Sequence, residues 1–214
     1  EDEPPYEVRE TPWLSAAELR YLKGTEEALE RLYNSGRFRR TLEYLFGQLK
    51  LEPFELFGQF GQYLAARGTY GMPLDNFLAL ILEYFGTQAG IDRITLRDKL
   101  VCDFLATNAS GSLPAVLRIE DPALNRIKKN LQRKKPVQRV RRGLAILYSI
   151  PFVVYVDYQD KNPVTGEYAL NFVEKKDSLM PGIKMSPGSC PGLRIVSARH
   201  YRCEIIKLWN LWKL

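Results

Sequence analysis

The clearest folding signal lies in residues 36–68, which read GRFRRTLEYLFGQLKLEPFELFGQFGQYLAARG. Apolar residues recur there at intervals of three and four, the spacing that places side chains on one face of an α-helix. Pro53 interrupts the pattern and suits the first turn of a new helix, where no amide hydrogen bond is lost. The stretch therefore predicts two helices, one from about residue 37 to residue 49 and one from Pro53 to a stop at Gly68. Gly58 and Gly61 have no phosphate-loop context, and we expect them to let a neighbouring helix approach closely.

Helical signals continue toward the N-terminus. Ser15 and Glu18 form a capping box, in which the hydroxyl and the carboxylate each bond the other residue's backbone amide. Gly24 is expected to break this first helix, and Thr25 to begin a second one. Gly36 is expected to end that second helix as a left-handed cap.

Toward the C-terminus, Pro73 is expected to open a fifth helix and Thr95 to cap a sixth, with Asp98 at its capping-box position. A seventh helix is predicted to begin at 121–122 and to end near the Lys-Lys-Pro break at residues 134–136. Short connections between seven short helices indicate a compact helical bundle.

The pattern changes after residue 136. Residues 144–148 and 152–158 are rich in β-branched and aromatic side chains, and alternation returns at 168–173 after a turn-forming segment. These features predict a β-hairpin with a long loop. Residues 193–197 and 201–208 are candidates for two further strands.

The predicted fold class is therefore α+β, predominantly α: a compact bundle of about seven short helices with a small C-terminal β-hairpin or sheet appendage. We predict a helical domain over 1–135 and a small β-rich appendage packed on it over 136–214. Apolar residues are 45% and charged residues 26% of the chain, as in globular proteins. No apolar run approaches the roughly 20 residues that cross a bilayer, so we expect no membrane association.

The candidates for catalysis and metal binding are few. His200 is the single histidine, and Ser–His or Cys–His chemistry would have to use it. Zinc ligands usually come in pairs two to four residues apart, whereas Cys102, Cys190 and Cys203 lie far from one another. We therefore predict no metal site and no catalytic residue in this chain. Such cysteine usage, with no signal peptide in a sequence that opens EDEPPY, favours a cytoplasmic domain that follows a linker or was excised.

The charge is distributed unevenly. Residues 1–125 hold 13 Lys/Arg and 19 Asp/Glu, whereas residues 126–214 hold 18 and 6. Nine cations and no acid fall within 126–142, forming a basic patch of Arg126, Lys128, Lys129, Arg133, Lys134, Lys135, Arg139, Arg141 and Arg142. A solvated helix end that leads into a basic strand is one interpretation. The alternatives are a module that binds nucleic acid or an acidic partner through this segment.

Several stretches together carry a family resemblance. They are Pro4-Pro5-Tyr6-Glu7-Val8, Trp13-Leu14, Leu22-Lys23-Gly24, Tyr33-Asn34-Ser35-Gly36-Arg37-Phe38, Thr41-Leu42-Glu43-Tyr44-Leu45, Pro53-Phe54-Glu55-Leu56-Phe57, Val156-Asp157-Tyr158 and Asp160-Lys161-Asn162-Pro163-Val164-Thr165-Gly166. In these stretches the chain resembles the C-terminal domain of unknown function found in cobalamin-binding radical S-adenosylmethionine proteins, which are often labelled methyltransferases or oxidative cyclases. The helical half resembles it best, and nothing beyond about Met180 does.

The resemblance implies a bacterial parent polypeptide in which a cobalamin-binding domain and a radical barrel precede this domain. The parent would use S-adenosylmethionine, a 4Fe-4S cluster and cobalamin, none of which is expected in this chain. The cluster-binding Cys-x3-Cys-x2-Cys and corrinoid-binding Asp-x-His-x-x-Gly patterns do not occur in the sequence. The implied function is a non-catalytic accessory domain, a lid or substrate-docking element whose partners are the two upstream domains.

The candidate residues for contacting substrate or the barrel form one short segment. They are Tyr33, Asn34, Ser35, Gly36, Arg37 and Phe38. A glycine helix cap bracketed by two packed aromatic residues also accounts for this segment, so both interpretations stay open at this point.

Overall fold

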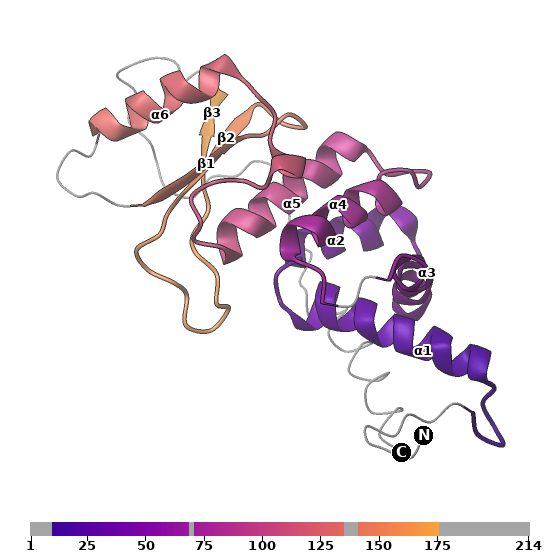
Figure 1. The fold of residues 1–214 in the computed structure, drawn as a ribbon. Helices are drawn as coiled ribbons and strands as arrows, with labels where there is room; N and C mark the ends of the chain where they lie inside the picture. Colours follow the sequence, from indigo (N-terminus) through magenta and orange to yellow (C-terminus); the bar gives the residue numbers. More distant parts are fainter. Residues whose placement is uncertain (1–9, 69–70, 135–140, 176–214) are drawn as a thin grey trace. The chain divides into compact units, whose positions relative to one another are not determined.

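The computed structural model describes residues 10–68, 71–134 and 141–175, all of which belong to one compact unit, Glu1–Gly182. Figure 1 shows the path of the chain. The elements follow one another as α1 (Ala16–Leu29), η1 (Glu30–Asn34), α2 (Arg39–Leu49), α3 (Pro53–Ala65), α4 (Leu74–Phe85), α5 (Arg93–Thr107), η2 (Ala115–Leu117), α6 (Pro122–Lys134), β1 (Arg142–Ile146), β2 (Phe152–Asp157) and β3 (Asn171–Glu174).

The predicted α+β fold is confirmed for the described residues, which form six α-helices and a three-stranded antiparallel sheet of order β1-β2-β3. The possible strands at 193–197 and 201–208 lie outside the described residues. The boundary between 135 and 136 stays a prediction. Among the described residues, no helix combines the length and apolar character that crossing a bilayer requires.

Gly24 does not break the first helix, so the two helices expected on either side of it are one. The predicted capping box is present: the Ser15 hydroxyl accepts from the Glu18 amide, and the Glu18 carboxylate accepts from the Ser15 amide. α1 continues past Gly24 because α3 crosses it there in very close contact. A Cβ atom added at Gly61 would lie 2.1 Å from the carbonyl oxygen of Gly24. The expectation that the α3 glycines admit a neighbouring helix is confirmed.

The start of α5 also differs from the prediction. Its N-cap is Asp92, three residues before Thr95, and the Asp92 carboxylate accepts from the Thr95 amide and hydroxyl. An aspartate is as good an N-cap as a threonine, so the earlier residue begins the helix. Asp98, expected at the capping box of Thr95, lies instead in the helix interior and is buried.

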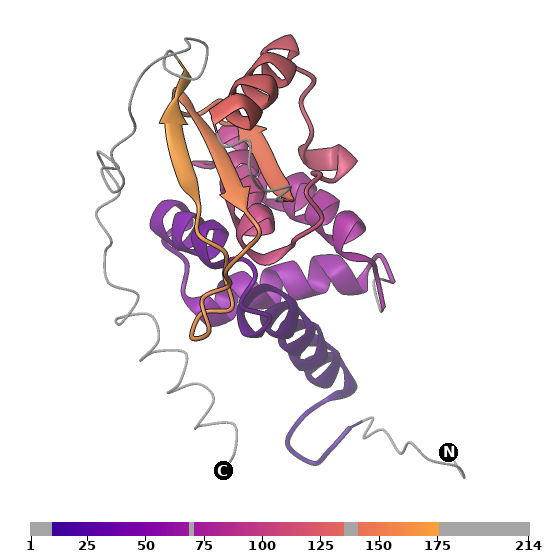
Figure 2. The ribbon, with the colours of Figure 1, turned by 90° about the vertical axis from the view of Figure 1, so that its left-hand side faces the viewer.

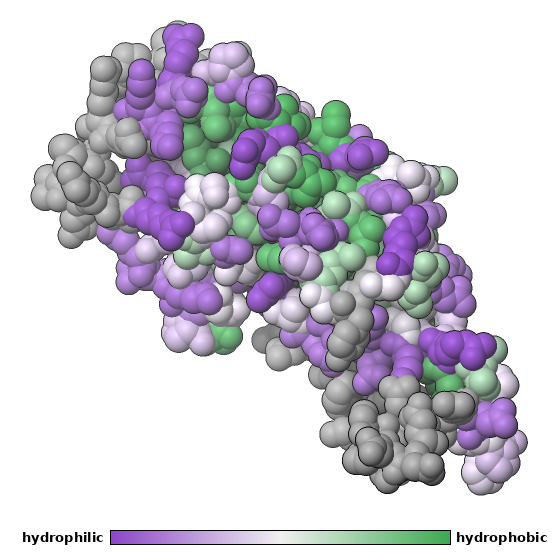
Figure 3. Space-filling view, in the orientation of Figure 1, coloured by the Kyte–Doolittle hydropathy of each residue, from purple (hydrophilic) through white to green (hydrophobic). Residues whose placement is uncertain are grey.

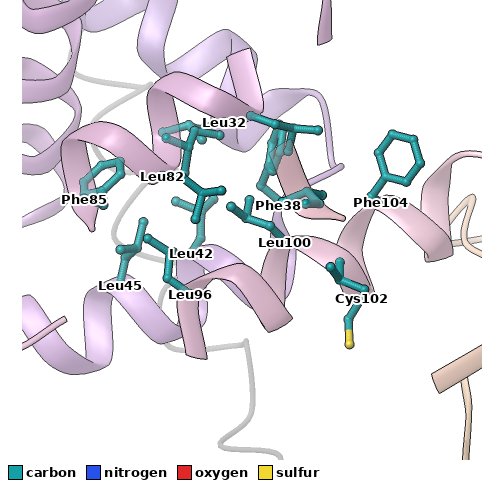
Figure 4. Packing of buried hydrophobic residues seen from close by; sticks show 14 of the residues in the cluster. Leu32, Phe38, Leu42, Leu45, Leu82, Phe85, Leu96, Leu100, Cys102 and Phe104 are labelled. Carbon is teal, nitrogen blue, oxygen red and sulfur yellow. The ribbon is translucent and has the colours of Figure 1, made fainter. Parts of the chain in front are cut away.

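One apolar core joins the helices to one face of the sheet. Leu42 and Leu45 of α2 meet Leu96 of α5, as Figure 4 shows, and all three are buried. The same cluster includes Val154 and Val156 of β2. Residues on the other face of the sheet, among them Ile146 and Val153, form a small second cluster with Ile127 of α6. The sheet therefore lies between α5 and α6.

α5 is the central helix of this arrangement. Ten of its 15 residues are buried, and it contacts α2, α4 and both β1 and β2. Figures 1 and 2 show the β2–β3 loop (residues 158–170, orange) projecting from the sheet toward the helical part. Because Arg97, Asp98 and Asp103 are among the buried residues of α5, these three charged side chains must find partners inside the protein.

Candidate functional site

The turn at residues 33–38 begins with a local widening of the helix. α1 ends in the π-helical turn η1, in which the Ser35 amide donates to the carbonyl of Glu30 at 3.0 Å. Gly36 has φ of 67°, and its amide donates to the carbonyl of Tyr33. This left-handed residue ends the helix, so the predicted glycine cap is confirmed. π-helical turns inside helices often occur at functional sites.

The side chains of this turn divide into anchors and an exposed edge. Phe38 is 3% exposed and packs edge-to-face on Phe77, while Tyr33 is half-buried against the core. Asn34, Ser35 and Arg37 are exposed. The arrangement fixes a short polar edge between two packed aromatic residues.

Local hydrogen bonds hold that edge in shape. The side-chain amide of Asn34 donates to the Glu30 carboxylate at 2.6 Å, and the Ser35 hydroxyl donates to the backbone carbonyl of Arg31 at 2.7 Å. The Ser35 oxygen also accepts from the Arg37 amide at 3.3 Å. Within the described residues, the Arg37 guanidinium forms no hydrogen bond or ion pair, which leaves its donors available to a partner.

Directly behind the turn, a buried carboxylate of α5 caps α2. None of the side chains at the start of α2 caps its own helix. Instead, Asp103 accepts from the amides of Arg40 and Thr41 at 3.1 and 2.8 Å, and from the Thr41 hydroxyl at 2.7 Å. Asp103 thus does from another helix what an N-cap residue does locally, and its negative charge suits the positive end of the helix dipole.

Arg40 extends this contact to the β2–β3 loop. Its guanidinium bonds Asp103 Oδ1 at 3.2 Å through one nitrogen and Glu167 Oε2 at 3.0 Å through another. The Tyr168 amide, in the same loop, donates to the carbonyl of Ala106 on α5 at 2.7 Å. We call Asp103, Arg40, Thr41 and Glu167 the Asp103 clamp. It joins the start of α2, which directly follows the 33–38 turn, to Glu167, which directly follows the 160–166 stretch.

The ionisation of the clamp reflects its burial. Loss of hydration raises the pKa of Asp103 to about 6, and the pairing with Arg40 and the hydrogen bonds from Thr41 only partly oppose this. Burial works against the charge on Arg40 as well, but Asp103 and Glu167 together hold its pKa above the ordinary value. The clamp is therefore charged at neutral pH, and Asp103 begins to take up a proton as the pH falls toward 6.

The tip of the β2–β3 loop is also held in a fixed shape. The Asn162 side-chain oxygen accepts from the amides of Val164 and Thr165 at 2.9 and 3.1 Å. Gly166 has φ of 67° and donates to the carbonyl of Asn162, which closes the turn. The result is a preformed tip at which the Val164 side chain, in a residue 91% exposed, projects into solvent.

A second carboxylate of α5 holds the sheet. Asp98 accepts from the amides of Tyr148 and Ser149, both at 2.7 Å, and from the Ser149 hydroxyl. Arg97 pairs with it at 2.6 Å and also donates to the carbonyls of Leu117 and Ile146. The contacts of this buried pair outside α5 go to β1, to the β1–β2 turn or to η2, so its role is structural.

The basic run predicted at 126–142 is divided by the structure. Arg126, Lys128 and Lys129 are exposed on α6, and Arg133 and Lys134 belong to the last turn of that helix. Lys135 and Arg139 lie outside the described residues. Arg141 donates to the carbonyl of Ser110, and Arg142 pairs with Asp157. Among the described cations of the run, Arg126, Lys128 and Lys129 are exposed without an ion pair, and all three lie on α6, where Figure 3 shows a hydrophilic surface.

The other candidates contribute no site among the described residues. Cys102 is buried, burial raises the pKa of its thiol to about 12, and its sulfur points away from the other side chains labelled in Figure 4. Cys190, Cys203 and His200 lie outside the described residues. No group of three or more His, Cys, Asp or Glu side chains that could hold a metal ion occurs in the described part of the chain.

Sequence reasoning missed the buried charges. The one available signal was position: Asp103 stands between Cys102 and Phe104 in an otherwise apolar stretch of α5. An acid there must be paired, because a buried carboxylate without hydrogen bonds is too costly to retain. The sequence does not identify Arg40, 63 positions earlier, as its partner.

The fold and these contacts define a class: a mainly helical α+β domain whose buried charges hold two preformed surface segments. The chain belongs to the family described as a protein of unknown function (DUF4080), which matches residues 1–145. The match covers all six helices and the first strand except its last residue, Ile146. No curated protein and no solved structure matches the chain.

Proposed function

We propose that this DUF4080 chain is a non-catalytic accessory domain that docks on the catalytic domains of a cobalamin-dependent, methyltransferase-like radical S-adenosylmethionine enzyme. The resemblance of residues 33–45 and 156–166 supports the choice of enzyme class. The main support for docking is the exposed polar edge formed by Asn34, Ser35 and Arg37. Packed aromatic residues and the Asp103 clamp hold this edge in place on its buried side.

Preorganisation is what gives such an edge its value in docking. A surface that is already in its bound shape loses little conformational entropy when the partner arrives. The Asn34 and Ser35 side chains are held by hydrogen bonds of 2.6 and 2.7 Å, so only Arg37 has to be ordered on binding. Arg37 would then bond a carboxylate or a backbone carbonyl of the partner.

The two buried carboxylates of α5 support an accessory role over a catalytic one. Asp98 and Asp103 each accept from two backbone amides and a hydroxyl, and each pairs with an arginine. Those bonds position other elements of the protein. In the parent, S-adenosylmethionine, the 4Fe-4S cluster and cobalamin would be held by the preceding domains, and this domain would help to exclude water and quenchers from them.

The test uses the full parent polypeptide with its cofactors reconstituted. The double variant Asn34→Ala with Arg37→Ala removes the outward donors and leaves the clamp intact. Arg20→Ala with Asn76→Ala is the matched control, because it also removes one exposed arginine and one exposed asparagine, from α1 and α4. Each lost hydrogen bond of about 1 kcal/mol lowers the docked population about fivefold.

Two readouts follow the docked state: reductive cleavage of S-adenosylmethionine and the rate at which oxygen bleaches the cluster absorbance. We expect the site variant to bleach faster and to cleave more slowly, with its melting temperature unchanged, while the control matches the wild type. If the site variant and the control behave alike in both assays, the proposed docking edge is wrong.

A further inference from the structure

The outer face of α6 carries a concentration of positive charge that the proposed docking edge does not use. Its 13 residues, PALNRIKKNLQRK, include five cations and no acid. Ile127 is 1% exposed and packs on the sheet, whereas Arg126, Lys128 and Lys129 are exposed. α6 is therefore held by a small apolar contact on one side and presents cations on the other.

These cations differ from their neighbours in the same run. The chain engages Arg141 and Arg142 with the Ser110 carbonyl and with Asp157. Within the described residues, no acid pairs with Arg126, Lys128 or Lys129. Like charges one helical turn apart repel each other by a few tenths of a kcal/mol, roughly the amount that an ion pair gains. A negatively charged ligand on this face would remove that cost.

We infer that the exposed face of α6 binds the phosphate backbone of double-stranded nucleic acid. A lysine-rich surface without acids fits phosphates better than a protein partner, because lysine is depleted in protein–protein interfaces and protein–DNA interfaces are strongly basic. Binding of single strands needs aromatic side chains on which bases stack, and α6 has none. Phosphate contacts need only cations and backbone donors.

The geometry of the helix suits a backbone contact. Arg126 and Lys129 lie one helical turn apart on α6, and Lys128 directly precedes Lys129. At 1.5 Å per residue, all three exposed cations therefore lie within about 5 Å of one another along the helix axis. The contact would be independent of sequence, and the inference does not rest on the proposed accessory function.

The test measures binding of the full 214-residue chain to labelled mixed-sequence duplexes of about 20 base pairs, RNA and DNA, as salt rises from about 50 to about 200 mM. For B-DNA, each neutralised phosphate contributes about −0.9 to the slope of log affinity against log salt. The triple variant Arg126→Gln, Lys128→Gln and Lys129→Gln should therefore make that slope shallower by about 2.7. Between about 50 and about 200 mM salt, the affinity of the variant should therefore fall about 40-fold less than the affinity of the wild-type chain.

The matched control, Arg20→Gln with Arg39→Gln and Lys50→Gln, removes three exposed cations from α1, α2 and the end of α2, and should bind as the wild type does. Circular dichroism must show unchanged helix content in both variants. No duplex binding at low salt, an equal loss in the control, or equally tight binding to single strands would overturn the inference. Equal affinity for polyglutamate would also overturn it and would indicate an acidic protein partner.

Discussion

Replacing Asp98 by alanine should weaken the attachment of the sheet to α5, and it should destabilise the protein more than the removal of an exposed acid does. In the native protein its carboxylate accepts from the Tyr148 and Ser149 amides at 2.7 Å and pairs with Arg97 at 2.6 Å. The side chains of Arg97 and Asp98 are 8% and 4% exposed, so solvent screens the pair little. Breaking a buried pair by removing one partner costs about 3–5 kcal/mol, because the other charge stays buried without compensation.

The upper part of that range does not apply, because Arg97 keeps its bonds to the carbonyls of Leu117 and Ile146. We therefore expect Asp98→Ala to lower the free energy of unfolding by about 3 kcal/mol. Urea unfolding of the full chain, followed by circular dichroism, measures this loss. Asp75→Ala, which removes an exposed acid from the first turn of α4, should change stability by less than about 0.5 kcal/mol.

Hydrogen exchange adds a local readout to the same variant. Protection in β1 and β2 should fall further than protection in α2 and α3, since Asp98 contacts the β1–β2 turn and neither of those helices. A loss below about 1 kcal/mol would refute the view that this carboxylate holds the sheet in place. Uniform loss of protection in every element would refute the local assignment.

Three other predictions test single features of the structure. Native Asp103 has a pKa of about 6, against about 3.9 in an unfolded chain. Its contribution to the free energy of unfolding should therefore fall as pH rises from about 4 to 6, by at most about 1.4 kcal/mol per pH unit. Urea titrations of the wild type and of Asp103→Asn with parallel pH profiles would contradict this. Tyr158→Phe deletes a buried hydroxyl that has no partner among the described residues and should leave stability unchanged or about 1 kcal/mol higher, whereas a clear loss in thermal melts would reveal a missed hydrogen bond. Gly61→Ala should cost about 1–3 kcal/mol of stability by forcing α1 and α3 apart. Gly47→Ala, with open space around its Cβ, should instead stabilise α2 by about 0.5–1 kcal/mol. Equal melting temperatures of the two variants would refute the close crossing.

The parts of the fold that were predictable from sequence depend on interactions between near neighbours. The capping box at Ser15 joins residues three apart, and the cap at Gly36 depends on one backbone conformation that glycine adopts easily. The periodicity of apolar residues likewise identified the buried faces of α2 and α3. Such signals can be read within a window of a few residues.

The errors have the opposite origin, because they concern contacts between distant segments. Gly24 has the low helix propensity that suggested a break, but the close crossing with Gly61 makes an absent side chain an advantage there. The partners of Asp103 are residues 40, 41 and, through Arg40, 167. No local pattern specifies which distant amides a buried acid will cap, so the clamp was not predicted.

The candidate surface also depends on contacts between distant segments, so it exists only in the folded protein. The 33–38 turn and the β2–β3 loop each read locally as ordinary turn sequence. Asp103 fixes the start of α2, and Arg40 passes that restraint to Glu167 at the base of the loop. Because Arg40 bonds both carboxylates, a change at either one alters the support of the other. Docking variants are therefore informative only at Asn34, Ser35 and Arg37, whose removal leaves these buried bonds in place.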